Sequence, residues 1–97
     1  MILKKRKEID DIFKLGIRIP GRIFNAFVHT SGKSSVAFLI SKRTGNAVKR
    51  NRMKRLFREA FRINKKKFEG KEIIFYIKRF QDDFQIVTQH VKNLMLL

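Results

Sequence analysis

Near the N-terminus, apolar residues recur at helical spacing. Ile9, Ile12 and Phe13 lie three and four positions apart, and Gly16 follows them as a stop signal. Since residues three and four apart share one face of a helix, this spacing predicts a short helix over about Glu8 to Leu15.

From Arg22 to Thr30 the pattern changes to an alternation that is typical of a strand. One predicted face is apolar, which suits a core, and the other mixes aromatic and polar side chains. The two faces are Phe24, Ala26 and Val28, and Ile23, Asn25, Phe27 and His29.

A second strand is predicted at Val36 to Ile40, a continuous apolar run of strand length. Ser31 to Ser34 supplies turn chemistry between the two strands. We therefore expect a hairpin whose second strand is buried on both faces.

The longest predicted helix runs from Asn46 to about Asn64, after a loop at Thr44 to Asn46. Asn46 can cap this helix, because its side-chain oxygen can accept a hydrogen bond from the first turn. The apolar residues at helical spacing are Met53, Leu56, Phe57, Ala60 and Phe61.

The strongest strand signal is Glu72 to Lys78, which we expect to be central in the sheet. Asp82 and Asp83 then favour a helix start, and apolar residues follow at helical spacing to Leu94. The predicted order is α-β-β-α-β-α. The fold class is α+β, one compact domain over residues 1–97 with helices packed on a small mixed sheet.

Charge narrows the class of partner. The chain has 24 Lys and Arg against eight Asp and Glu, a formal net charge of +16, which opposes compaction unless a polyanion supplies counter-charge. Nucleic acid is the leading partner, and the alternatives are binding to a membrane surface or a basic surface that is merely soluble.

The chain has no cysteine, and the charged residues from Lys4 to Glu8 interrupt any apolar run that could serve as a signal peptide. We therefore expect a cytoplasmic protein with no membrane partner.

The helix predicted from Asn46 carries basic residues where folding disfavours them. No acid occurs between Lys42 and Arg58, although the positive end of the helix dipole favours Asp or Glu at its start. A ridge of basic residues spaced by four lies opposite the apolar stripe and suits phosphate oxygens. The ridge is Arg50, Lys54, Arg58 and Arg62. A solvated charged face is the alternative interpretation.

Three further residues allow two interpretations. Asn51 is either surface filler or a donor to phosphate or ribose. Phe13 and Phe27 are either core residues or part of a base-stacking platform, since Phe27 shares its strand face with Asn25 and His29.

Catalytic side chains are not apparent. His29 and His90 lie on different predicted elements, and the acids form small local groups that helix ends explain. We predict neither catalytic residues nor a metal site in the protein, so any chemistry would reside in a partner.

The segment ISKRTGNAVKRNRMKRLFREAF resembles the signature helix of the bacterial ribonuclease P protein subunit. It contains the SK-x-x-GNAV entry at Ser41 to Val48 and the RNR triplet at Arg50 to Arg52. The resemblance continues, more weakly, through the I-x-x-IFKLG helix at Ile9 to Gly16 and the F-x-x-F strand at Phe24 to Phe27.

The resemblance implies an accessory subunit that binds a catalytic RNA, which uses Mg²⁺ to remove the 5′ leader of precursor tRNA. It also implies a left-handed β-α-β crossover around the signature helix. A leader-binding cleft is implied at Ile9, Phe13 and Phe27. Relatives commonly have an aromatic residue in place of Ile9 and tyrosine in place of Phe27. We expect one copy in a ribonucleoprotein and no DNA partner. The residues predicted to contact RNA are Lys42, Arg43, Asn46, Lys49, Arg50, Asn51, Arg52, Lys54, Arg55, Arg58 and Arg62.

Three other functions stay open at this point. A non-catalytic RNA-binding module, such as a small ribosomal protein, shares the same basic helix and the same salt dependence. A DNA-binding helix would discriminate among duplex sequences, and a protein-only nuclease would cleave without added RNA.

Overall fold

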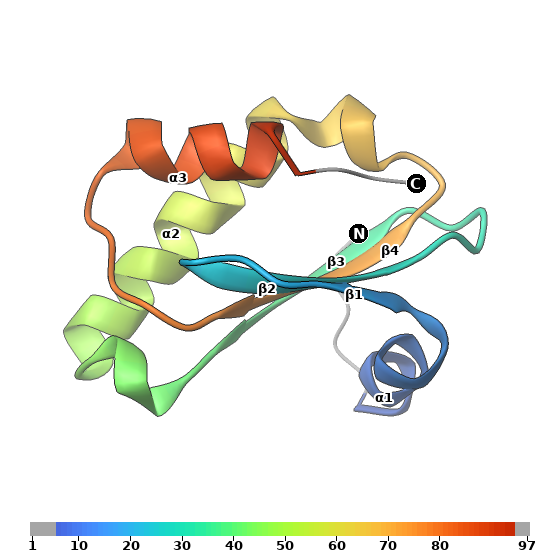
Figure 1. Ribbon diagram of the computed structural model, residues 1–97, viewed down its shortest axis with the longest axis horizontal. Coiled ribbons are helices and arrows are strands. Elements are labelled where there is room, and N and C mark those ends of the chain that lie inside the picture. Colours follow the sequence, from blue (N-terminus) through green and yellow to red (C-terminus); the bar gives the residue numbers. More distant parts are fainter. Residues whose placement is uncertain (1–5, 95–97) are drawn as a thin grey trace.

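The computed structural model describes residues 6–94 (Figure 1). Short 3-10 turns at Lys42–Thr44 and Lys65–Phe68 flank the long helix. The helices are α1 (Arg6–Leu15), α2 (Ala47–Ile63) and α3 (Phe84–Lys92), and the strands are β1 (Ile17–Ile19), β2 (Phe24–His29), β3 (Ser35–Ile40) and β4 (Glu72–Ile77). The three helices and three longer strands lie where the sequence predicts them, within about two residues at most ends.

The four strands form one mixed sheet in the order β1-β2-β4-β3. β4 is central, as predicted, and pairs with β2 antiparallel and with β3 parallel. The predicted hairpin of β2 and β3 is therefore wrong. β4 is buried at four of its six positions, and its place between β2 and β3 gives this apolar strand a partner along each edge.

β1 is a strand that the sequence analysis missed. Its three residues pair antiparallel with β2, so that Ile17 lies opposite Val28 and Ile19 opposite Ala26. The predicted order α-β-β-α-β-α is corrected to α-β-β-β-α-β-α. The segment is too short for an alternating pattern, and Pro20 follows it directly.

β3 and β4 are parallel and are joined through α2, which is a β-α-β crossover. The implied presence of a crossover through this helix is confirmed, and its left-handedness stays a prediction. A parallel pair places the carboxyl ends of both strands, Ile40 and Ile77, side by side at one end of the sheet.

The helices cover both faces of the sheet. Figure 1 shows α2 and α3 on one side and α1 on the other. The larger core lies under α2 and α3, where Phe57 and Val87 pack against Phe75 of β4. The smaller core lies under α1, where Ile12 packs against Ala37 and Ile74. No helix among residues 6–94 is long and apolar enough to cross a membrane.

Alternation along β2 assigns its side chains to these two layers as the sequence predicts, but Ile23, predicted on the face of Phe27, precedes the strand and lies in the larger core. Phe24, Ala26 and Val28 belong to the larger core, and Phe27 packs on the smaller one under α1. Gly16 ends α1, with its N–H donating to Ile12 O at 2.8 Å. A Cβ atom there would lie 2.5 Å from the same oxygen, so the turn from α1 into β1 requires glycine.

Candidate nucleic-acid interface

The start of α2 is fixed by two neighbouring residues. Asn46 caps the helix as predicted, because its Oδ1 accepts a hydrogen bond from the Lys49 N–H at 3.0 Å. Gly45 precedes it with a φ of +137°, a conformation that L side chains rarely adopt, and a Cβ atom there would lie 2.8 Å from Lys49 Cδ. These two residues therefore fix where α2 begins and the direction of its first turn, which carries the first basic side chains.

α2 has one buried face and one basic face. Met53, Leu56, Phe57 and Ala60 are buried against the sheet and α3. Of the residues predicted to contact RNA, only Arg50 and Lys54 are half-buried, and the others are exposed. The exposed ones are Lys42, Arg43, Asn46, Lys49, Asn51, Arg52, Arg55, Arg58 and Arg62.

Two arginines of this basic face are already paired with carboxylates. Arg52 Nε donates to Asp82 Oδ1 at 2.6 Å, and Arg62 Nη2 donates to Glu59 Oε1 at 2.5 Å. The hydrogen bond from Arg62 lowers the pKa of Glu59, and the same bond raises the pKa of Arg62. The other basic residues of the predicted set make no ion pair with a described residue, so they are available to an external anion.

The middle of the basic ridge borders a hollow beside the edge strand β3. Arg50, Asn51 and Lys54 line this space of about 330 Å³ together with Leu39. Asn51 thus lies among basic groups at the wall of a recess, which favours its interpretation as a donor to a ligand.

On the opposite face of the sheet, α1 and β2 bring the three predicted cleft residues together. The rings of Phe13 and Phe27 meet edge to face, with centroids 4.7 Å apart. Ile9 and Phe27 are half-buried and pack against the core under α1, whereas Phe13 is 38% exposed. Phe27 is therefore partly a core residue, and Phe13 presents ring surface to solvent on which a base can stack.

Sequence reasoning missed a hollow of about 830 Å³ at the carboxyl ends of β3 and β4. Arg43 was predicted, but Tyr76, Lys78, Arg79 and Phe80 come from the end of β4 and were not. Lys49 lies nearby, with Nζ 5.3 Å from the centroid of the Phe80 ring. The basic pair directly after the strongest strand is the sequence signal that could have found this basic hollow.

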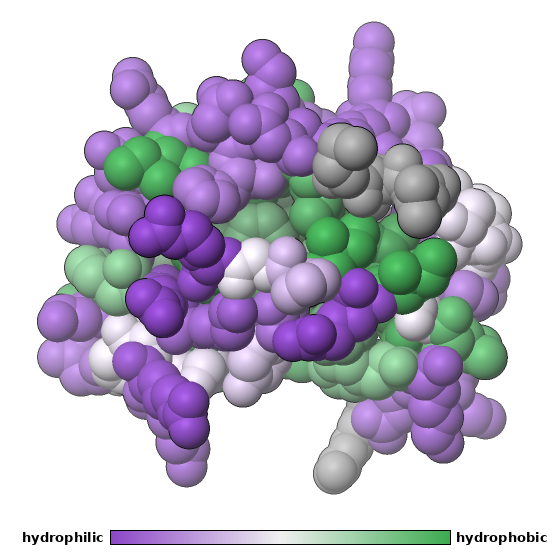
Figure 2. All heavy atoms as spheres, viewed as in Figure 1, coloured by the Kyte–Doolittle hydropathy of each residue, from purple (hydrophilic) through white to green (hydrophobic). Residues whose placement is uncertain are grey.

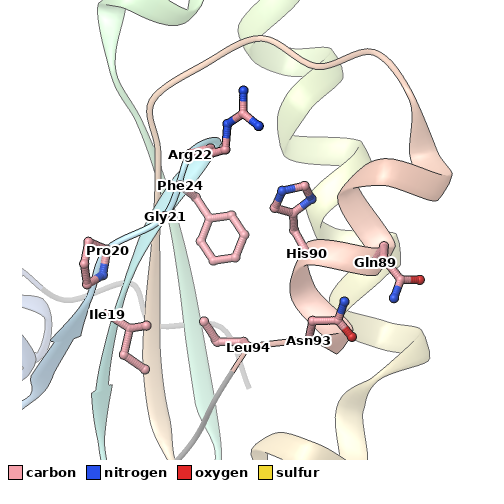
Figure 3. Close-up of a pocket in the computed structure, with 9 residues that line it drawn as sticks. All are labelled: Ile19, Pro20, Gly21, Arg22, Phe24, Gln89, His90, Asn93 and Leu94. Atoms are coloured by element: carbon pink, nitrogen blue, oxygen red, sulfur yellow. The ribbon is translucent and has the colours of Figure 1, made fainter.

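A further hollow, of about 310 Å³, lies between the turn from β1 to β2 and α3. Figure 3 shows Phe24 and His90 side by side, with Arg22 above them and Leu94 below. No residue of the predicted interface lines it, so it is separate from the basic face of α2.

The outer surface also has separate hydrophilic and hydrophobic areas. Figure 2 shows hydrophilic residues over most of the face seen in Figure 1, and hydrophobic residues gathered near β1 and its junction with α1. Leu15 and Ile17, at that junction, are 65% and 58% exposed.

Among the described residues, no three His, Cys, Asp or Glu side chains gather closely enough to hold a metal ion.

The chain is similar to known proteins over nearly its full length. The family model Ribonuclease P matches residues 1–96. The "Ribonuclease P protein component" of Pelotomaculum thermopropionicum is 36% identical over 99 residues, covering 99% of this chain and 88% of that protein. The protein of the same name from Finegoldia magna is 34% identical over 83 residues, covering 84% and 74%.

Solved structures show the same fold. The RNase P protein of Thermotoga maritima, in complex with 1-(4-fluorophenyl)-2-thiourea, superposes with a TM-score of 0.82 at 24% identity, covering 96% of this chain and 99% of that one. A Staphylococcus aureus RNase P protein mutant gives a TM-score of 0.81 at 24% identity, covering 94% and 81%. With the family model, the relatives and the fold in agreement, the chain belongs to the ribonuclease P protein family.

Proposed function

We propose that this protein is the protein subunit of a ribonuclease P, the endoribonuclease that removes the 5′ leader of precursor tRNA. The observation that carries the proposal is the position of α2. Apart from Arg52 and Arg62, the arginines and lysines of its basic face have no carboxylate partner among the described residues. This helix lies on a chain of the ribonuclease P protein family. Family membership favours this function over a small ribosomal protein, a DNA-binding helix or a protein-only nuclease.

The proposed partner of α2 is the RNA subunit. Arg55 and Arg58 are exposed and make no ion pair with any residue in the described range, and Arg50, Asn51 and Lys54 line the recess beside β3. Guanidinium and ammonium groups neutralise phosphates and release their counterions, which supplies most of the affinity for a polyanion. This binding compensates for the basic residues that the helix dipole disfavours.

The proposed partner of the cleft at Ile9, Phe13 and Phe27 is the single-stranded leader. The exposed ring of Phe13 offers a stacking surface, and Phe27 holds that ring by its edge-to-face contact at 4.7 Å. Apolar and aromatic contacts of this kind tolerate any base, so the cleft would recognise the presence of a leader more than its sequence.

Bond cleavage is assigned to the RNA subunit. We assign the Mg²⁺ that the reaction requires to the RNA subunit, because phosphate oxygens are ligands that Mg²⁺ prefers. The protein would position substrate and screen phosphate repulsion. We expect one copy to act in a cytoplasmic ribonucleoprotein.

The dependence of substrate affinity on leader length tests the leader assignment. With the complex of protein and RNA subunit, lengthening the leader from one to several nucleotides should strengthen binding of precursor tRNA, by about 1–3 kcal/mol for each base that stacks. The RNA subunit alone should show little of this dependence. Equal affinity for long and short leaders in the presence of the protein would contradict the proposal.

A further inference from the structure

A hollow of about 680 Å³ lies between α1 and the end of the sheet opposite the basic hollow. β3 and β4 begin here, at Ser35 and Glu72, and β2 ends here at His29. Glu8 and Asp11 reach it from α1. Three carboxylates therefore converge on one recess of a chain that has only eight acids and 24 basic residues.

Within the described part of the chain, these carboxylates have almost no ion-pair partners. Glu72 is only 14% exposed at its side chain, and its one ion-pair contact is a long one, 3.8 Å from its Oε1 to His29 Nδ1. Glu8 and Asp11 make no ion pair with a described residue, and Lys33 lines the hollow without pairing with any of the three. Because a carboxylate without a close partner is costly to bury, the largely buried Glu72 favours a cation from outside the chain.

Ser35 supplies a second, independent observation. It lines the same hollow and is 9% exposed, and its Oγ is buried with no hydrogen-bond partner. On the sheet it lies directly opposite Glu72. Buried hydroxyls in folded proteins nearly always have a partner, so this hydroxyl is free to pair with a group from outside the described chain.

The local helix alone does not explain the acids. Glu8 lies in the first turn of α1, where the dipole favours a carboxylate, but Asp11 lies mid-helix and Glu72 is on a strand. A single metal ion does not explain them either, because no three metal-binding side chains among residues 6–94 gather closely enough to share one. A ligand with separated positive charges would match separated carboxylates.

We propose that this acidic hollow binds a linear organic polycation whose primary ammonium groups are separated by methylene chains. The ammonium groups would donate hydrogen bonds to the carboxylates of Asp11 and Glu72 and to Ser35 Oγ. The methylene chain would lie against Ile12 and Leu15, which also line the recess. The binding does not depend on RNA, so its failure would leave the proposed function untouched.

Calorimetric titration of the full chain with spermidine at low ionic strength tests the proposal. We expect saturable binding that Asp11→Asn or Glu72→Gln each weakens about fivefold, as for loss of one charge pair. Asp10→Asn is the matched control, because Asp10 is on the same helix and exposed but does not line the hollow. Equal weakening by Asp10→Asn, or no saturable binding to the folded wild-type chain, would overturn the proposal.

Ser35→Ala separates a ligand contact from a folding contact. The hydroxyl has no partner in the free protein, so its removal should leave the melting temperature unchanged or slightly higher while spermidine binding weakens. Unchanged affinity would contradict the assignment. Mg²⁺ should compete with spermidine less well than the diammonium putrescine at equal concentration, since both carry two charges, and stronger competition by Mg²⁺ than by putrescine would indicate a metal site and overturn the proposal.

Discussion

Single arginines of α2 differ in whether a carboxylate already holds them. Arg58 and Arg62 lie one turn apart on the same exposed ridge, but only Arg62 is paired, with Glu59. Arg58→Ala should weaken binding to the RNA subunit and reduce the slope of log K against log salt concentration by about 0.7 to 0.9. Arg62→Ala should have a smaller effect, because Glu59 already holds the Arg62 guanidinium, so that Arg62 makes a weaker contact with phosphate. A larger loss from Arg62→Ala, measured in the same salt titration, would contradict this ranking.

Phe13 is the residue that tests the leader cleft with least risk to the fold, because it is 38% exposed. Phe13→Ala should weaken binding of precursor tRNA that carries a leader, by about 1–3 kcal/mol, and leave binding of leaderless tRNA unchanged. Leu15→Ala is the control, since it removes an exposed apolar side chain from the same helix outside the cleft. Equal losses with and without a leader would show that Phe13 does not contact the leader.

At the scale of elements, the cap of α2 makes a measurable contribution to the free energy of unfolding. Asn46→Ala removes the acceptor for the Lys49 N–H and should lower the free energy of unfolding by about 1 kcal/mol. Asn51→Ala should be neutral or slightly stabilising, because Asn51 is exposed in the helix interior, where alanine is the better helix former. Chemical denaturation of the two variants measures both values. A similar loss for both would show that the cap hydrogen bond contributes nothing specific.

Elements that depend on local pattern were predictable, and pairings between distant segments were not. The periodicity of α2 and its Asn46 cap predict its bounds, and the apolar run of β4 predicts a central strand. The hairpin of β2 and β3 was wrong, because turn chemistry at Ser31 to Ser34 says nothing about a later strand that inserts between them. β1 was missed because three residues carry no periodicity.

The same distinction holds for the candidate site. The basic face of α2 follows from spacing within one helix, and so the sequence predicts it. The pair of Arg52 with Asp82 and the basic hollow around Arg43 and Lys78 join segments thirty or more positions apart, so only the fold brings them together. The contact of Phe13 with Phe27 was implied by family resemblance and not by periodicity.

The whole molecule carries a formal net charge of +16 on 97 residues. Repulsion among these positive charges lowers the stability of the folded state. Raising the concentration of a simple salt should therefore raise the melting temperature, because screening acts over about 10 Å at 0.1 M and weakens repulsion between unpaired basic groups. Calorimetry across a series of salt concentrations measures this. A melting temperature that falls steadily with added salt would mean that the ion pairs of Arg52 and Arg62 outweigh the repulsion.

Charge is also unevenly distributed along the sheet. The basic hollow lies at the carboxyl ends of the parallel strands β3 and β4, and the acidic hollow lies where they begin. The six paired residues of β3 separate the two ends by about 20 Å, at about 3.3 Å per residue. RNA phosphates would therefore be attracted to the basic hollow more strongly than to the acidic one.

The central claim is that the protein assists cleavage by a catalytic RNA and does not itself break bonds. Cleavage of a precursor tRNA at low Mg²⁺ concentration, with the cognate RNA subunit alone, the folded protein alone, and both together, tests this claim most directly. The account predicts correct 5′ maturation only when both are present. Cleavage by the protein alone, or no gain on adding folded protein to the RNA, would contradict it.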